Sequence, residues 1–248
     1  MVANAPPPAR SGRIHCIDAA RGFAVVLMIV YHLAWDLTFY RLADIPMYDS
    51  WFWLNFRYFI PTIFLGLVGF GLVLAHRQGI RPRPFLRRLA ILVACAGAIT
   101  VGSYAVFPES YIFFGILHSI ALCSVLGLAF LRLPVTLIIA AAVFCVAAPW
   151  LFADPFFDQP ALQWIGLMTY FPSTNDFEPI FPWFGAVLAG MALGRLALGR
   201  GQHWAIFKWQ PQGPLSASLS WTGRHALAVY MLHQPLLLGL LYLVAMAG

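Results

Sequence analysis

Long apolar runs dominate this chain and constrain its fold more than any other feature. A helix that crosses a bilayer needs about 20 mostly apolar residues, and suitable runs lie at 14–40, 51–76, 85–106, 110–131, 133–152, 179–199 and 219–246. Apolar residues make up 61% of the 248 residues and charged residues only 10%, whereas a soluble domain carries about a quarter charged residues. The sequence therefore predicts an all-α, polytopic integral membrane bundle with about seven transmembrane helices.

The loop charges predict the orientation of this bundle. With a cytoplasmic N-terminus, the cytoplasmic segments hold most of the loop cations: Arg10, Arg13, Arg77, Arg81, Arg83, Arg87, Arg88, Arg132, Arg195, Arg200 and Lys208. The opposite side has Arg41 as its only loop cation and takes most of the acids: Asp44, Asp49, Glu109, Asp154, Asp158, Asp176 and Glu178. Because basic loops stay in the cytoplasm, we expect a multi-pass protein of the bacterial inner membrane, with its C-terminus outside.

The chain is expected to form one membrane domain. Residues 1–13 are rich in proline and alanine and predict a flexible cytoplasmic N-terminus, and 14–248 contain no long linker. Residues 153–178 hold three prolines and three aspartates, which favour a partly ordered external loop, with a short interfacial or re-entrant helix at 162–168.

The net charge and the spacing of the cysteines limit the kinds of partner and ligand that we expect. The net charge of +6 fits retained cytoplasmic arginines rather than a nucleic-acid surface, so we expect membrane lipids and no nucleic acid. The four cysteines, Cys16, Cys95, Cys123 and Cys145, lack the paired spacing of a metal site, and no metal is expected.

The first apolar run carries one polar stripe. Asp18, Arg21, His32 and Asp36 fall within an arc of about 60° on a helix. Ionisable residues at membrane depth are functional candidates, because inserting one costs at least about 2.5–3.5 kcal/mol. Asp36 stands four residues after His32, a spacing that lets a carboxylate hold one ring nitrogen and leave the other for proton transfer. In the structural alternative, Arg21 snorkels to the cytoplasmic interface and Asp36 reaches the external one.

Other polar residues at membrane depth extend this pattern. Arg57 should lie near the depth of Asp36, either as its structural ion-pair partner or as a substrate ligand. Arg21 and Arg224 should both lie near the cytoplasmic end, where arginines bind phosphates well.

Three histidines from different runs predict a central polar cavity. His32, His118 and His233 are all expected near mid-depth, although a single intramembrane histidine is often only an interhelical hydrogen-bond donor. Pro235 would add a polar group, since it leaves the carbonyl of Met231 without its helical partner. Cations inside, histidines at the centre and an acidic loop outside suit a reaction between a cytoplasmic anionic donor and an external acceptor.

Several motifs resemble known membrane acyltransferases. The first helix, with ten residues between Arg21 and His32, looks like the R-x10-H signature of the acyltransferase-3 group. Four segments are similar to bacterial members of the heparan-α-glucosaminide N-acetyltransferase-like family: YHLAWDL at 31–37, FGILH at 114–118, DFEPIFPWFG at 176–185 and GRHALAVYMLHQP at 223–235.

This resemblance implies transfer of an acyl group, expected to be acetyl, from cytoplasmic acyl-CoA to a sugar or lipid-linked acceptor at or across the membrane. His32 would be the general base or a transient acyl carrier, oriented by Asp36. The remaining roles it implies are CoA phosphate contacts for Arg21 and Arg224, and substrate contacts for Arg57, His118, Asp176, Tyr230 and His233.

Two other functions remain open at this point. The chain could be a non-catalytic subunit that keeps the fold within a larger membrane complex, and a homo-oligomer is also open. A small transporter ranks last, because such proteins are usually built from inverted repeats and none is visible in the sequence.

Overall fold

The computed structural model describes residues 14–200 and 205–247, so the predicted flexible segment 1–13 lies outside the described residues. The long helices are α1 (His15–Phe39), α2 (Trp51–Ala75), α3 (Pro82–Val106), α4 (Ile116–Phe130), α5 (Val135–Phe152), α6 (Ile180–Arg200) and α9 (Ala226–Ala247). Short elements complete the chain: η1 (Pro108–Ser110), η2 (Pro155–Asp158), η3 (Gln163–Ile165), α7 (Ala205–Lys208) and α8 (Pro214–Arg224). The predicted all-α class is confirmed.

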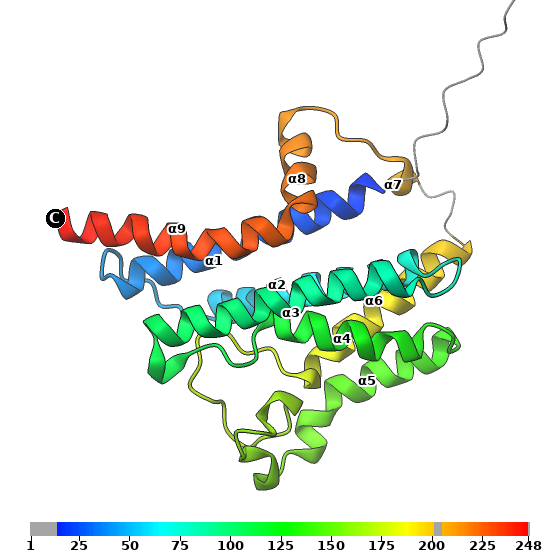
Figure 1. Ribbon diagram of the computed structural model, residues 1–248, viewed down its shortest axis with the longest axis horizontal. Coiled ribbons are helices and arrows are strands. Elements are labelled where there is room, and N and C mark those ends of the chain that lie inside the picture. The colour runs from blue at the N-terminus through cyan, green and yellow to red at the C-terminus, as the bar shows by residue number, and fades with distance from the viewer. Residues whose placement is uncertain (1–13, 201–204, 248) are drawn as a thin grey trace, which may run out of the picture.

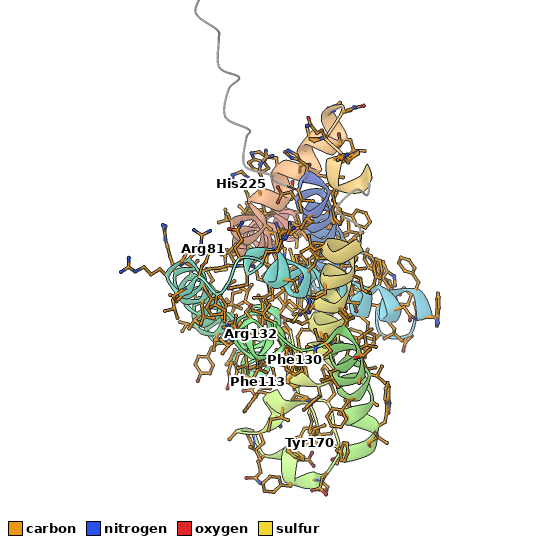
Figure 2. All side chains as sticks on the ribbon, turned by 90° about the vertical axis from the view of Figure 1, so that its right-hand side faces the viewer. Arg81, Phe113, Phe130, Arg132, Tyr170 and His225 are labelled. Carbon is orange, nitrogen blue, oxygen red and sulfur yellow. The ribbon has the colours of Figure 1, made fainter. Side chains whose placement is uncertain are left out.

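Within the described residues, six helices are long and apolar enough to cross a membrane: α1, α2, α3, α5, α6 and α9. The seventh predicted crossing, α4, has 15 residues and is about 22 Å long, against a hydrocarbon core of about 30 Å. The chain is thus a multi-pass membrane protein, while the count of seven, the orientation of the termini and the single-domain division stay predictions. Figure 1 shows that the long helices run roughly along one axis, with the α2–α3 and α4–α5 connections at the same end. Figure 2 labels Arg81 and Arg132, which belong to these two connections.

Glycines bring the backbones of α2 and α6 into direct contact. A Cβ on Gly69 would overlap the carbonyl of Val187, and one on Gly190 would overlap the carbonyl of Gly66. Small residues of this kind allow the close helix approach that drives packing in lipid, where the hydrophobic effect between helices is absent. The largest apolar cluster spreads from this contact over α3, α4 and α5.

The last predicted run, 219–246, is two helices rather than one. α8 ends at Arg224 and α9 begins at Ala226. Glycines also let α8 pack closely on α1, because a Cβ on Gly22 or on Gly223 would overlap a carbonyl of the other helix. The break lets α8 cross α1 near the start of α9, as Figure 1 shows.

The run predicted at 110–131 is also shorter, because α4 begins only at Ile116. The preceding residues are extended and pair with the end of the loop before α6: Asn175 N–H donates to the Ser110 carbonyl at 3.0 Å, and Glu178 N–H donates to the Phe114 carbonyl at 3.0 Å. The end of the predicted external loop is therefore packed into the bundle. The helix expected at 162–168 is a single 3-10 turn.

Candidate active site between helices α1 and α9

His32 of α1 and His233 of α9 face each other across the contact between these two helices. Their ring centroids are 4.9 Å apart, with the ring planes inclined at 57°. His32 is partly exposed and His233 is buried. The structure thus brings together two of the three histidines that the sequence predicts at the centre.

The hydrogen bonds of His233 define which of its nitrogens is available. Its Nδ1–H donates to the Tyr230 carbonyl at 2.6 Å, because a carbonyl only accepts. Its Nε2 is buried and has no hydrogen-bond partner within the described residues. A neutral ring with a proton on Nδ1 carries a lone pair on Nε2, so this buried nitrogen is an acceptor beside His32.

Asp36 does not hold His32 as predicted. Its Oδ1 accepts a hydrogen bond of 2.7 Å from Gln234 Nε2 on α9, and its buried Oδ2 has no hydrogen-bond partner among the residues described. The i, i+4 spacing made the intrahelical pair possible, but the facing amide of Gln234 binds the carboxylate instead. Asp36 therefore links α1 to α9.

The predicted ion pair between Arg57 and Asp36 is also not formed. The guanidinium of Arg57 lies over the ring of Phe171, 5.1 Å from its centroid. It also interacts electrostatically with Asp176 and Glu178. The cause is the loop before α6, which folds back on the bundle and offers Arg57 an aromatic face and two acids.

Asp176 and Glu178 form an acidic group close to this centre. Burial raises the pKa of Asp176, against the Ile116 backbone N–H and the charge of Arg57, which lower it. Burial and the neighbouring Asp176 raise the pKa of Glu178 well above its ordinary value, and Arg57 again opposes the shift. Both acids lie within electrostatic range of Tyr230.

Glu178 was not predicted as a site residue. It is only 7% exposed, and its Oε2 has no hydrogen-bond partner in the described part of the chain. One signal was present in the sequence: Asp176 and Glu178 are two residues apart, and an extended segment places such residues on one side.

His118 belongs to a different environment. Its Nδ1 accepts from the Gly115 N–H at 3.2 Å, and its Nε2 lies 3.2 Å from the Thr100 hydroxyl oxygen. That hydroxyl donates to the Ile112 carbonyl at 2.7 Å, so His118 is the donor to Thr100. Both of its ring nitrogens thus hold the start of α4, and a cavity shared with the other two histidines stays a prediction.

Asp176 stabilises the same helix start. Its Oδ2 accepts from the Ile116 N–H at 2.9 Å, which satisfies a backbone donor that the helix itself leaves free. A Cβ on Gly115 would overlap this carboxylate. Asp176, which the sequence predicted to contact substrate, thus has a structural role at the start of α4.

The arginines predicted to bind phosphate lie where α1 meets α8. Arg21 pairs with Asp18 at 3.2 Å, and its guanidinium also donates to the Gly223 carbonyl at 3.4 Å. Arg224 follows that carbonyl directly and is exposed. The structure therefore brings Arg21 close to the backbone beside Arg224.

Comparison with protein families decides what kind of molecule carries this arrangement. The family described as "Heparan-alpha-glucosaminide N-acetyltransferase, catalytic" matches residues 13–235. The chain belongs to this family. No curated protein and no solved structure matches it.

Membership in the heparan-α-glucosaminide N-acetyltransferase catalytic family confirms the resemblance read from the sequence. It makes the chain a member of a membrane acetyltransferase family, and hence of a transferase family, and it points to acyl-CoA as co-substrate. The matched span contains His32, His233 and the whole acidic group.

Proposed function

We propose that this protein transfers an acetyl or other acyl group from acyl-CoA to a sugar or lipid-linked acceptor at or across the bacterial inner membrane. His32 is the general base. The observation that supports this most is the buried Nε2 of His233 beside the His32 ring, which has no hydrogen-bond partner among the described residues. A buried polar atom without a partner is rare and calls for a functional explanation.

The two histidines divide the work of proton transfer. His32 is partly exposed and takes a proton from the acceptor hydroxyl or amine. As His32 becomes positively charged, its other ring N–H donates to Nε2 of His233, which the Tyr230 carbonyl holds in the accepting tautomer. His233 thus has the orienting role that the sequence assigned to Asp36, in the same sense as the third member of a catalytic triad.

The chemistry is one acyl transfer. The deprotonated acceptor attacks the thioester carbonyl, a new C–O or C–N bond forms, and the C–S bond breaks. The proton on His32 then goes to the CoA thiolate, which leaves as the thiol. No acyl-enzyme is needed, although His32 as a transient carrier gives the same products.

The acceptor side is formed by the loop before α6. Arg57 and Tyr230 keep their proposed acceptor contacts, and Glu178 joins them, since a carboxyl group binds sugar hydroxyls well. Asp176 and His118 support this side indirectly by fixing the start of α4. On the donor side, Arg21 and Arg224 bind phosphate.

Transfer of label from acetyl-CoA tests the proposal. Purified protein in nanodiscs is incubated with [¹⁴C]acetyl-CoA and with amino sugars, neutral sugars or a lipid extract of the bacterial envelope, and label in the acceptor is counted. The wild type labels an acceptor, His32→Ala loses the activity, and His76→Ala, a histidine bonded to the Leu72 carbonyl at the end of α2, keeps it.

Two results would overturn the proposal. One is full turnover in His32→Ala with wild-type thermal unfolding, which would remove His32 from the mechanism. The other is a chain that neither binds acyl-CoA nor transfers label and always co-purifies with one membrane partner, as a non-catalytic subunit would.

A further inference from the structure

A basic cavity opens between the first turns of α3 and the start of α9. Its volume is about 610 Å³, and its lining includes Arg83, Arg87 and Arg88 over an apolar floor of Ile91, Leu92 and Leu227. Arg83 and Arg87 are four positions apart and share one face of α3, and Arg88, the next residue, also lines the cavity. The cavity is distinct from the contact between His32 and His233.

In the described part of the chain, no acid neutralises these arginines. Within residues 14–200 and 205–247, none of the three forms an ion pair. Arg88 instead lies close enough to Arg21 of α1 to be repelled by its charge, although Asp18 partly balances Arg21. Guanidinium groups that converge on one cavity without a carboxylate form a site for an anion, and phosphate oxygens match their paired N–H donors.

The simple alternative is that these arginines only keep a loop in the cytoplasm. The same connection contains Arg77 and Arg81, which serve that purpose equally well and do not line the cavity. They are therefore matched controls for charge and position.

We propose that this cavity binds the phosphate groups of the acyl donor, at the nucleotide end of acyl-CoA. The inference rests on the proposed function and names the residues that hold its donor. Along α1, Arg21 is eleven residues from His32, about 16 Å at helical rise, which is comparable with an extended pantetheine arm. Along α9, Leu227 in the cavity is six residues from His233, about 9 Å. With its phosphates at the arginines, the donor can reach the histidine pair with its thioester.

An anionic lipid headgroup offers the same phosphate chemistry but no thioester, and the experiment separates the two sources. KM and kcat are measured for acetyl-CoA and for S-acetylpantetheine, which has no phosphate, in phosphatidylcholine nanodiscs. The variants are Arg87→Gln/Arg88→Gln, Arg88→Lys and the control Arg77→Gln/Arg81→Gln.

The double variant should raise KM for acetyl-CoA about 100-fold, which corresponds to about tenfold for each charged hydrogen-bonding group lost. Its kcat and its KM for S-acetylpantetheine should stay within about twofold of wild type. Arg88→Lys keeps the charge without the paired donors, so its KM for acetyl-CoA should lie between those of wild type and the double variant. The control variant should match wild type. Size-exclusion profiles and thermal unfolding confirm that each variant is folded.

An equal effect on both donors, or no effect on acetyl-CoA, would overturn the assignment. Loss of phosphatidylglycerol binding in native mass spectrometry, with KM for acetyl-CoA unchanged, would also overturn it and give the cavity to lipid. Binding of adenosine 3′,5′-bisphosphate, measured by calorimetry, is independent of catalysis. If the wild type transfers from neither donor but binds this nucleotide and the double variant does not, the proposed function fails and the phosphate site stands.

Discussion

The start of α4 and the contact between α1 and α9 each contain a histidine, and the two differ in what remains free. At the start of α4, both ring nitrogens of His118 are engaged, by Gly115 and by Thr100. Between α1 and α9, His233 uses one nitrogen, and the other is buried without a partner in the described residues. A complete set of hydrogen bonds holds structure, while an unused acceptor is available for chemistry.

The neighbouring groups follow the same division. The carboxylate of Asp176 accepts from a backbone N–H at the start of α4. Between α1 and α9, Asp36 Oδ2 and Gln234 Oε1 are buried with no hydrogen-bond partner in the described ranges. Unsatisfied polar atoms thus gather around the histidine pair, which is the pattern expected of a site that becomes complete when substrates bind.

Removing the base should have the largest effect. We expect His32→Ala to lower kcat by about 10²- to 10⁴-fold, the usual contribution of general acid–base catalysis, and His233→Ala to follow in the same direction. Steady-state release of CoA measures this, and unchanged thermal unfolding shows that the loss is chemical. A His233→Ala enzyme at full rate would remove the second histidine from the mechanism.

His118→Ala should lower stability and leave kcat nearly unchanged, the reverse of what we expect for His32→Ala. It leaves the Gly115 N–H and the Thr100 hydroxyl short of one partner each, and such losses destabilise by about 1–3 kcal/mol, or about 2–4 °C in Tm per kcal/mol for a chain of this size. Differential scanning fluorimetry measures Tm, and kcat per folded molecule should be close to wild type. Loss of kcat at unchanged Tm would place His118 with the catalytic pair after all.

Glu178→Gln should change how stability depends on pH. Burial raises the pKa of Glu178 well above its ordinary value of 4.5, so the folded chain keeps a proton that the unfolded chain releases. Stability is therefore lost as pH rises from about the ordinary value towards the raised pKa. The glutamine variant removes this loss, so its Tm should exceed that of wild type at pH 8 and match it near pH 4. A lower Tm for the variant at pH 8 would mean that the carboxylate is charged and stabilised by Arg57.

Asp36→Asn should change activity only slightly. An asparagine oxygen can still accept from Gln234, so the link between α1 and α9 persists, and kcat should change by less than about threefold. The matched change Gln234→Leu breaks this link and leaves the carboxylate buried alone. A fall in kcat for Asp36→Asn as large as that of His32→Ala would restore Asp36 as the group that orients the base.

Sequence patterns predicted what depends on local periodicity. The apolar runs located five of the long helices, α1, α2, α3, α5 and α6, to within a few residues, and the motifs identified the family. The shared depth of His32 and His233 also predicted their meeting, because each position follows from its distance along its own helix.

The missed features all depend on contacts between distant segments. Gln234 binds Asp36 from 198 residues away, and residue spacing within one helix cannot predict a pair between two helices. α4 begins late because residues 174–178 pair with the segment before it, and the last run breaks where glycines let α8 cross α1. The cavity of Arg83, Arg87 and Arg88 went unnoticed as a site because charge counting placed these residues only as cytoplasmic cations.

The most direct test of the central claim is a single-turnover transfer from [¹⁴C]acetyl-CoA, followed in parallel for wild type, His233→Ala and His118→Ala at equal amounts of folded protein. Our account predicts that the rate falls at least about 100-fold in His233→Ala and stays near wild type in His118→Ala. A wild-type rate in His233→Ala together with an inactive but folded His118→Ala would contradict it, and would move the chemistry from the contact between α1 and α9 to the start of α4.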